Sequence, residues 1–585
     1  MRPEDFVFAT VMLPLLGAAL AFFAKILPKG RFASIVEYVG AFVGLGLPWF
    51  VLIRLFSSVL SGWSVTGVVG QWSQGVGIAF QFDGLAWLIN ILGYTIATVA
   101  WLYSLGAGPR GPAFTGVFLI QTAALSATIM TADLFNLFVL LEIMGITSYV
   151  LIPTSEKLGA TLASFSYLMV SATAMVFFLL GTYGFYRLTG SLSYEGIATG
   201  LQSITPSETM LSLVSLTLLV SAIAIRVAVM PLYGWLPDAH ALAPHAVSAV
   251  LSGVLIKTPL FALSRILLVF PAGMQVGYLM SIAGGVTAVV GVVIALSQQD
   301  AKRLLAYHSI SQIGYIVAAW GMAITVGVDT PAGTSLMVAA FLHAFYHALF
   351  KGLLFLSVGT TVDVAKERNV YVLRGAIGKL RNAGERVPVT FMGFLIGALA
   401  ISAIPPLNGF ASKSAITYAM KGSANYYFLS VAAVGTVASF IKLSRIYWPA
   451  TKKKNRTTAM SNTQQVELPG LKKESFGLGA RLSAQSILAV LCLAGGIAAP
   501  FVLNTVGTLL SKGGLNIAIQ PVLYSTDNLV KTALTTIAGI VLFFLATSKT
   551  GSRILHLIRN RPRSFQGMFV SFSLGTAVLA AFLVL

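Results

Sequence analysis

Charged residues are scarce in this sequence. Only 10% of its 585 residues are Asp, Glu, Lys or Arg, whereas soluble domains carry about 25%. The deficit extends along the whole chain and accompanies repeated apolar runs of about 20 residues, the length that crosses a bilayer. A large soluble enzyme with an oversized core would not contain such runs. The composition therefore indicates a membrane protein.

Cysteine is almost absent, since Cys492 is the single thiol and lies inside an apolar run. One thiol cannot form an internal disulfide, and one thiolate cannot hold an iron–sulfur cluster or a zinc ion. The sequence also lacks a Walker phosphate loop, a Gly-rich dinucleotide loop after a strand and a metal-binding signature. We expect no cofactor, no metal and no redox catalysis in this chain.

Acidic residues are outnumbered, with 18 Asp and Glu against 38 Lys and Arg. In a soluble protein this excess would suggest a nucleic-acid partner. Here the basic residues fall mainly in short loops between apolar runs, and no basic stretch carries interleaved aromatic residues. We therefore expect lipid, and no nucleic acid, as the surrounding partner.

The apolar runs predict an all-α polytopic membrane protein with about 16 transmembrane helices. The start, MRPEDF, lacks the basic region and cleavage site of a signal peptide, so we expect the first helix to be retained. The predicted segments are 6–27, 33–59, 81–105, 113–131, 133–152, 160–188, 209–233, 243–270, 276–297, 304–326, 333–360, 388–419, 424–449, 483–507, 529–548 and 566–585.

Basic residues alternate between successive loops. With the N-terminus outside, the positive-inside rule makes every second loop cytoplasmic. The opposite loops, 60–80, 189–208, 326–333 and 508–528, hold almost no Lys or Arg. The pattern therefore predicts both termini outside. The predicted cytoplasmic loops carry Lys25, Lys29, Arg31, Lys157, Lys302, Arg303, the basic residues of 363–387, Lys452 to Arg456 and Arg553 to Arg563.

A short motif, called the echo below, occurs twice in the sequence, with its two copies 175 residues apart. Pro231-Leu-Tyr-Gly-Trp in the seventh segment matches Pro406-Leu-Asn-Gly-Phe in the twelfth. Each copy breaks a helix within a unit of five segments, and an odd number inverts the second unit across the membrane. The predicted divisions are N-terminal helices 1–112, a first inverted repeat 113–270, a second 276–449, a basic cytoplasmic linker 450–482 and C-terminal helices 483–585.

Ionisable residues inside apolar segments point to function, because they are costly in a bilayer. Glu142 lies half-way along segment 5, and Arg226 in segment 7 needs a carboxylate or carbonyl partner, for which Glu142 is the obvious candidate. Lys257 lies well inside segment 8. Asp133, Asp238 and His240 are equally compatible with water-contacting helix ends or loops. The secondary candidates are Asp133, Asp238 and His245, of which His245 counts among the bases inside the membrane.

Segment 11 carries the sharpest pattern, with His343, His347 and Lys351 at intervals of four residues. This spacing places all three on one helix face, about 6 Å apart per step. Imidazole titrates near neutrality and a buried amine can release its proton, so the row predicts a proton relay. Lys413, seven residues after the Pro406 break, would connect the row to one surface.

The candidate side chains also indicate which ion the protein transports. A sodium site needs several oxygen ligands, whereas most of these side chains are nitrogen bases. The set favours protons over sodium, although backbone carbonyls leave sodium open.

Several motifs together resemble one family: the antiporter-like subunits of respiratory complex I, the subunits of Mrp-type cation/proton antiporters and those of membrane-bound nickel–iron hydrogenases. The motifs run in family order over roughly residues 80–450. They are DLFNLFVLLEIMGITSYVLI, MPLYGWLPDAH, SAVLSGVLIKT, DAKRLLAYHSISQIGY, HAFYHALFKGLLFL and IPPLNGFASK. The resemblance implies a 14-helix core with inverted repeats and broken helices 7 and 12.

The resemblance also implies roles for the site residues. Glu142 would set the charge of its segment 7 partner, Lys257 would be a bridging base, and Lys413 would be the exit group beyond the central relay. Family members usually have Lys where this chain has Arg226. Arg cannot be deprotonated at physiological pH, so this half of the pathway departs from the family pattern.

Three functions follow from the resemblance. The first is a proton-translocating subunit of a redox-driven complex in a prokaryotic plasma membrane, with other membrane subunits and a soluble redox arm as partners. The second is a subunit of an Mrp-type Na⁺/H⁺ antiporter, and the third is a non-conducting structural subunit, motivated by Arg226. Further spanning helices in 483–585 favour the hydrogenase-type or Mrp-type branches over complex I proper.

Overall fold

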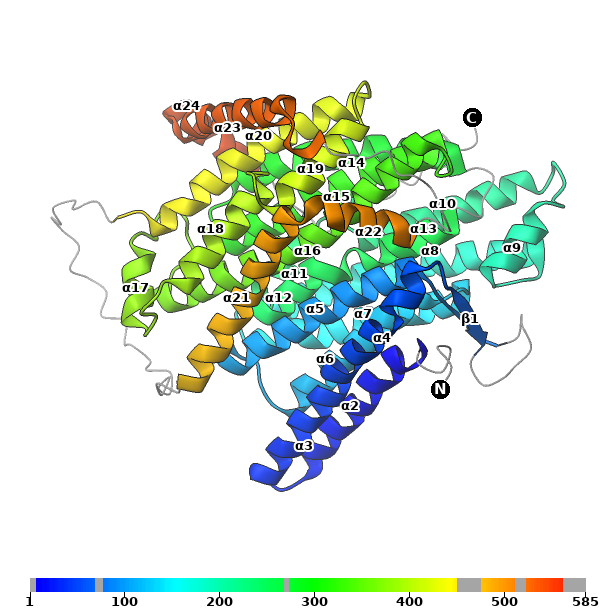
Figure 1. Ribbon diagram of the computed structural model, residues 1–585, viewed down its shortest axis with the longest axis horizontal. Coiled ribbons are helices and arrows are strands. Elements are labelled where there is room, and N and C mark those ends of the chain that lie inside the picture. The colour runs from blue at the N-terminus through cyan, green and yellow to red at the C-terminus, as the bar shows by residue number, and fades with distance from the viewer. Residues whose placement is uncertain (1–6, 69–76, 268–272, 450–474, 511–521, 561–585) are drawn as a thin grey trace.

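Helices make up nearly all of the regular structure, because a helix satisfies its own backbone amides where a bilayer offers no water. The computed structural model describes residues 7–68, 77–267, 273–449, 475–510 and 522–560. Most helices run side by side in one bundle, as Figure 1 shows. The expected all-α polytopic membrane fold is confirmed.

Fourteen helices of the described residues are long and apolar enough to cross a membrane. They correspond to predicted segments 1–11 and 13–15. Their elements are α2 (Ala9–Ile26), α3 (Arg31–Ala41) with η1 (Phe42–Gly46) and α4 (Leu47–Leu60), α5 (Gly84–Ala107), α6 (Pro112–Met130), α7 (Leu134–Leu151) with η3 (Ile152–Ser155), α8 (Ala160–Thr189), α10 (Thr209–Arg226), α12 (His245–Val250) with η4 (Leu251–Leu255) and α13 (Thr258–Leu267), α14 (Gly273–Ser297), α15 (Ala301–Val326), α16 (Pro331–Ala365), α20 (Ala424–Ser444) with η5 (Arg445–Tyr447), α21 (Ser475–Ile497) and α23 (Thr526–Thr547).

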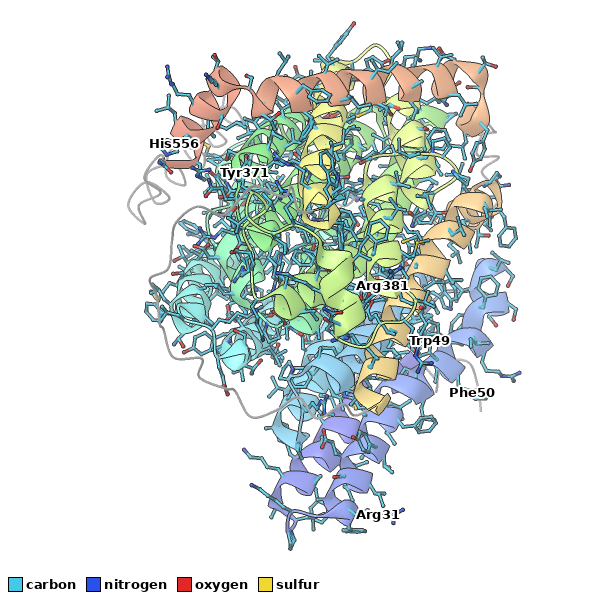
Figure 2. All side chains as sticks on the ribbon, turned by 90° about the vertical axis from the view of Figure 1, so that its left-hand side faces the viewer. Arg31, Trp49, Phe50, Tyr371, Arg381 and His556 are labelled. Carbon is cyan, nitrogen blue, oxygen red and sulfur yellow. The ribbon has the colours of Figure 1, made fainter. Side chains whose placement is uncertain are left out.

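Shorter elements complete the described structure. β1 and β2 form an antiparallel pair in which Val65 lies opposite Phe82. Figure 2 shows α24, with His556, at one extremity of the bundle and Arg31 at the other. These elements are β1 (Val65–Val68), β2 (Ala79–Phe82), α9 (Tyr194–Leu201), α11 (Leu236–Leu242), α17 (Ala376–Asn382), α18 (Val389–Ile401), α19 (Asn408–Ala419), α22 (Ala499–Leu510), η6 (Val522–Tyr524) and α24 (Lys549–Asn560).

The two predicted segments that contain the Pro-Leu-x-Gly echo are interrupted, as the sequence predicted. Segment 209–233 is helical only as far as Arg226, and segment 388–419 divides into α18 and α19. Both interruptions coincide with the Pro-Leu-x-Gly echo. At the two sites Ala228 and Ala403 have φ of 58° and 59°, a left-handed conformation that ends a helix. Two breaks that match in sequence therefore also match in backbone conformation.

A second correspondence links the starts of α7 and α15. Asp133 caps α7 and forms an antiparallel bridge with Ser193, while Asp300 caps α15 and forms the same bridge with Asn369. The first bridge leads into α9 and the second precedes α17, which lie at opposite ends of the bundle in Figure 1. These pairs fit the predicted inverted repeats, whose exact boundaries remain a prediction.

Predicted segment 566–585 and most of the predicted linker 450–482 lie outside the described residues. The last part of that linker differs from the prediction, because α21 begins at Ser475 and not at 483. α16, with 35 residues, is the longest helix of the described residues. It packs against α5, α12, η4, α15, α17, α18, α19, α21 and α22, so the predicted relay occupies a helix that is enclosed on most sides.

Candidate functional site

The row on α16 is fully enclosed. His343, His347 and Lys351 are each 0% exposed. The rings of His343 and His347 are nearly parallel, with centroids 6.1 Å apart and planes 10° apart. The structure thus places the predicted residues on one face, with the imidazoles stacked along the helix.

Few protein groups bind these imidazoles. His343 Nδ1 lies 3.0 Å from Ser412 Oγ. Among the described residues, His343 Nε2 and both ring nitrogens of His347 have no hydrogen-bond partner. Buried polar atoms are normally paired with protein or with ordered water. The open nitrogens therefore suit water molecules, which would join successive bases into a conducting file.

Lys351 ends the row. Its amine donates a hydrogen bond to the carbonyl of Leu305 on α15 and lies 5.3 Å from the centroid of the Phe355 ring. Both contacts accept positive charge without a carboxylate counterion. The amine is therefore held in place without a fixed ion pair that would oppose release of its proton.

Lys257 lies beside the row because its helix is irregular. η4 is a π-helical turn, and such turns free carbonyls from the usual ladder. The Lys257 amine donates to the carbonyls of Ser252 at 2.8 Å and Gly253 at 2.5 Å. The charge of Lys257 acts on His343, His347 and Lys351.

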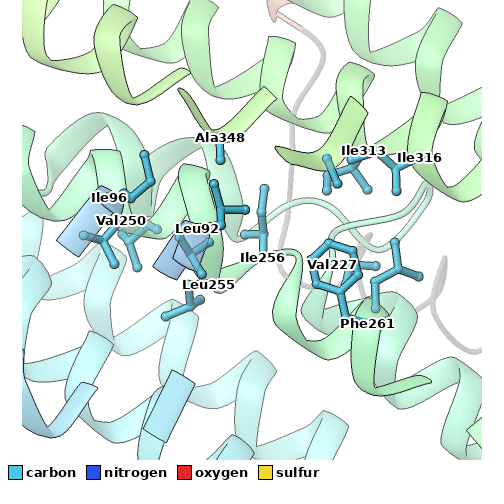
Figure 3. Packing of buried hydrophobic residues seen from close by; sticks show 14 of the residues in the cluster. Leu92, Ile96, Val227, Val250, Leu255, Ile256, Phe261, Ile313, Ile316 and Ala348 are labelled. Carbon is cyan, nitrogen blue, oxygen red and sulfur yellow. The ribbon is translucent and has the colours of Figure 1, made fainter. Parts of the chain in front are cut away.

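Apolar side chains enclose this turn, as Figure 3 shows. Leu92 and Ile96 of α5 lie on one side of Ile256, and Ile313 and Ile316 of α15 lie towards the other. Such walls strengthen electrostatic interactions between the buried amines, because little solvent screens them.

Lys413 continues the path beyond His343. The second break leaves the carbonyl of Ile401, the last residue of α18, available, and the Lys413 amine donates to it at 2.7 Å. The amine lies 4.9 Å from the centroid of Tyr315, and the Tyr315 ring lies 5.6 Å from that of His343. Lys413 and His343 are thus neighbours around one aromatic ring.

Arg226 and Glu142 lie together, as their sequence positions suggested. Arg226 Nη2 is 3.9 Å from Glu142 Oε1 and donates at 2.5 Å to the carbonyl of Leu141. The Arg226 side chain is 3% exposed, whereas that of Glu142 is 27% exposed. The contact is a loose ion pair in which the backbone carbonyl holds the guanidinium more closely than the carboxylate does.

The secondary candidates fall into different environments. Asp133 is mainly a helix cap that accepts a hydrogen bond from the Asn136 amide; burial raises the pKa of its carboxyl, opposed by backbone hydrogen bonds. Asp238 is half-exposed and pairs with Arg303 at 2.7 Å. His245 is buried and its Nε2 lies 2.7 Å from Asp363 Oδ2.

Several further buried or half-buried ionisable groups were not among the candidate site residues. They include Lys302, His308, Asp363 and Lys442. His308 lies within predicted segment 10, which was a usable signal. Lys302 lies before the predicted start of that segment and was expected in a cytoplasmic loop, but α15 begins at Ala301 and Lys302 is 0% exposed. Asp363 continues the four-residue spacing of the α16 row but falls beyond the predicted end of segment 11. In the described part of the chain, no group of three or more His, Cys, Asp and Glu side chains could hold a metal ion.

Comparisons with known proteins agree on one group. A family model described as NADH:quinone oxidoreductase/Mrp antiporter, transmembrane, matches residues 131–441. NADH-quinone oxidoreductase subunit N of Desulforudis audaxviator is 31% identical over 65% of this chain and 74% of its own length. A Na⁺/H⁺ antiporter subunit of Alkalihalophilus pseudofirmus is 28% identical over 75% of this chain and 85% of its own.

A solved structure extends the likeness to the fold. A chain of the Mrp complex from Dietzia sp. superposes with a TM-score of 0.73 at 24% identity, covering 91% of this chain and 100% of that one.

Proposed function

Since the chain belongs to the NADH:quinone oxidoreductase/Mrp antiporter family, and is an antiporter-like membrane subunit of the complex I, Mrp and hydrogenase type, we propose that it carries protons across the membrane in a redox-driven complex. The observation that carries this proposal is the fully enclosed row of His343, His347 and Lys351, which continues to Lys257 and Lys413. The energy would come from partner subunits, because the sequence carries no motif from which a redox group in this chain would be expected.

The geometry supports transfer by successive short hops. A proton taken up by the Lys351 amine would pass through water to His347, then to His343, and leave by Lys413. Each base gains one proton and loses one, so the row returns to its starting state. Lys257, which acts on three members of the row, would favour proton release when it is itself charged, because like charges repel in a poorly screened interior.

The Glu142–Arg226 pair would act on this row by charge and movement. Arg226 cannot release a proton, so it would not belong to the hopping file. A shift of its guanidinium between Glu142 and the Leu141 carbonyl would instead change the local field. The inverted repeats, with divisions near 113–270 and 276–449, would give each half one broken helix for such movement.

The proposal is tested in the intact complex reconstituted in vesicles. Lys351→Ala and His347→Ala should each lower proton translocation by roughly a hundredfold, the lower end of what a positioned proton-transfer group contributes. Lys421→Ala, in an exposed turn after α19, is the control and should leave translocation unchanged. Wild-type translocation by both relay variants in normally assembled complex would refute the relay.

A second function, Na⁺/H⁺ antiport without a redox partner, is favoured by the likeness to a Na⁺/H⁺ antiporter subunit over three quarters of this chain. Purification in mild detergent separates the two, because co-purifying chains with iron–sulfur or nickel centres would identify a redox-driven complex. Co-purification of small hydrophobic subunits alone, with Na⁺-driven proton exchange in vesicles, would identify the antiporter.

A third function, a structural subunit that no longer conducts, is motivated by Arg226. An Arg226→Lys variant that increases proton translocation would support impaired conduction in the natural chain. Unchanged translocation would leave Arg226 as a working variant of the family pattern.

We also infer a prokaryotic plasma membrane location with both termini outside. The support is the alternation of basic loops, in which 363–387 and 450–482 are cytoplasmic. Within 450–482, a fused reporter that works only in the cytoplasm should be active, and one that works only in the periplasm should be inactive. Activity of the periplasmic reporter at that position would contradict the orientation.

A further inference from the structure

The face of α16 that carries the relay continues to the end of the helix. Beyond Lys351, the same four-residue spacing leads to Phe355, Gly359 and Asp363. The Asp363 side chain is 52% exposed, so this end of the stripe reaches the molecular surface. Two positions, 355 and 359, separate the surface carboxylate from the buried amine and carry no titratable side chain.

Histidines from neighbouring helices lie against these two positions. A Cβ atom at Gly359 would lie 2.3 Å from His245 Cγ, so the absence of a side chain at 359 makes room for this imidazole. His245 is 4% exposed, and its Nε2 lies 2.7 Å from Asp363 Oδ2. Among the described residues, its Nδ1 has no partner. The ring thus presents one nitrogen to the surface carboxylate and keeps the other open towards the interior.

Phe355 separates a second histidine from the relay amine. The ring of His240 lies 5.8 Å from that of Phe355, and the Lys351 amine lies 5.3 Å from the same ring. His240 is 0% exposed, and neither of its ring nitrogens has a partner in the described part of the chain. A fully buried imidazole with two open nitrogens is costly unless water reaches it.

Lys302 connects the two histidines. Its amine donates to the Ala243 carbonyl at 2.6 Å and to Ser248 Oγ at 3.0 Å, and it is 0% exposed. Its charge acts on both His240 and His245. The charge of Lys351 also acts on His240. Every step from the surface to the relay therefore has a titratable neighbour.

We propose that Asp363, His245, Lys302 and His240 form the proton inlet that supplies Lys351 from the α16 C-terminal surface. This inlet rests on the proposed proton translocation. Asp363 takes a proton from bulk water and passes it to His245. The proton then moves through water to the Lys302 amine, when that amine is neutral. From Lys302 it continues to His240 and then to Lys351. Each group gains one proton and loses one, so nothing is consumed.

The alternative is that the His245–Asp363 pair is a structural contact, a clasp that only holds α12 and α16 together at the surface. Such a clasp would need only the 2.7 Å contact between His245 Nε2 and Asp363 Oδ2. It would not account for the open Nδ1 of His245, for the two open nitrogens of His240 or for the buried amine between them. The charges of His245, Lys157 and Lys302 act on Asp363, so the carboxylate has several basic neighbours and is not one half of an isolated pair.

The test uses the whole complex in vesicles and compares Asp363→Asn with Asp363→Glu. Asparagine keeps the shape but cannot carry a proton, so proton translocation should fall by roughly a hundredfold, the lower end of what a positioned proton-transfer group contributes. Glutamate should retain most of the translocation. Added formate, a small weak acid, should restore translocation in Asp363→Asn. Glu367→Gln is the matched control, since Glu367 lies four residues further along, where its carboxylate accepts a bond from the Asn369 amide.

His245→Gln gives a second measure, because it keeps a hydrogen-bonding side chain beside Asp363 without a titratable ring. It should lower translocation as Asp363→Asn does, in complex of normal subunit composition. Wild-type translocation by Asp363→Asn, or a loss that neither glutamate nor formate restores, would overturn the inlet and leave a clasp. If the unmodified complex itself moves no protons, the proposed function fails, and that outcome is distinct from failure of the inlet alone.

Discussion

Ala228 and Ala403 have the same left-handed backbone conformation at the two helix breaks, with φ of 58° and 59°. The amide of Val229, next to Ala228, donates to the carbonyl five residues before it at 3.0 Å, and the amide of Ile404, next to Ala403, does the same at 3.0 Å. The two turns therefore share the same hydrogen bond, from an amide to the carbonyl five residues before it. This bond leaves backbone carbonyls at each helix end available to side chains. At the second break, Lys413 uses the Ile401 carbonyl in this way.

Glycine at these two alanines should raise stability. A left-handed conformation costs an L-residue roughly 1–2 kcal/mol, and part of that gain is offset by the larger entropy of Gly in the unfolded chain. Ala228→Gly and Ala403→Gly should each stabilise the purified complex by up to about 1 kcal/mol, read as a higher unfolding temperature. Ala222→Gly, inside α10, is the control and should lower stability by roughly 0.5–1 kcal/mol. Lower unfolding temperatures for both break variants would contradict the strain.

The Glu142–Arg226 pair should respond asymmetrically to removal of either partner. Glu142→Gln leaves the charge of Arg226, only 3% exposed, without its carboxylate, whereas Arg226→Met leaves a carboxylate that is 27% exposed and accessible to water. Glu142→Gln should therefore cost more stability, about 1–3 kcal/mol, below the ~3–5 kcal/mol of a fully buried pair.

The double variant Glu142→Gln/Arg226→Met should recover stability towards the natural chain, because neither charge is then unpaired. Thermal unfolding of the four proteins in a double-mutant cycle measures the coupling. Additive losses would show that the two side chains do not interact across the 3.9 Å separation.

Ser412 should position the His343 ring. Its hydroxyl lies 3.0 Å from His343 Nδ1, and a hydrogen bond of this kind contributes about 1 kcal/mol. Ser412→Ala should slow proton translocation by roughly fivefold, the rate equivalent of that energy, while subunit composition stays normal. Ser430→Ala, whose hydroxyl donates to the Tyr426 carbonyl in α20, should leave the rate unchanged. Equal rates for the two variants would remove Ser412 from the pathway.

The end of α21 should tolerate no side chain where it meets the second break. A Cβ atom at Gly496 would lie 2.0 Å from the Pro406 carbonyl oxygen. Because backbone cannot yield as a flexible side chain does, Gly496→Val should destabilise by about 1–3 kcal/mol or more. In the same helix, Gly479 has open space around its Cβ position, so Gly479→Ala should be neutral or slightly stabilising. Thermal unfolding of the two variants gives the comparison, and equal stability would show that α21 moves away from the break.

The sequence by itself determined the places of most of the spanning helices, because a bilayer demands long apolar runs and excludes unpaired backbone. It also determined the row on α16, since helical periodicity alone aligns residues four apart. The pairing of Glu142 with Arg226 followed from the cost of leaving a buried charge alone. The breaks near Pro231 and Pro406 were also visible in the sequence, because Pro and Gly interrupt a helix inside an apolar segment.

Only the tertiary structure decided how groups distant in the chain meet. Nothing in local spacing indicates that His245 lies against Gly359 and His240 against Phe355 on α16, or that the Lys302 amine bonds to the Ala243 carbonyl between the two histidines. Lys413 comes to His343 only through the Tyr315 ring and a broken helix end. Periodicity describes one helix at a time, whereas these contacts depend on how helices pack against each other. The row was therefore visible in the sequence, while its connection to the surface appears only when the bundle is assembled.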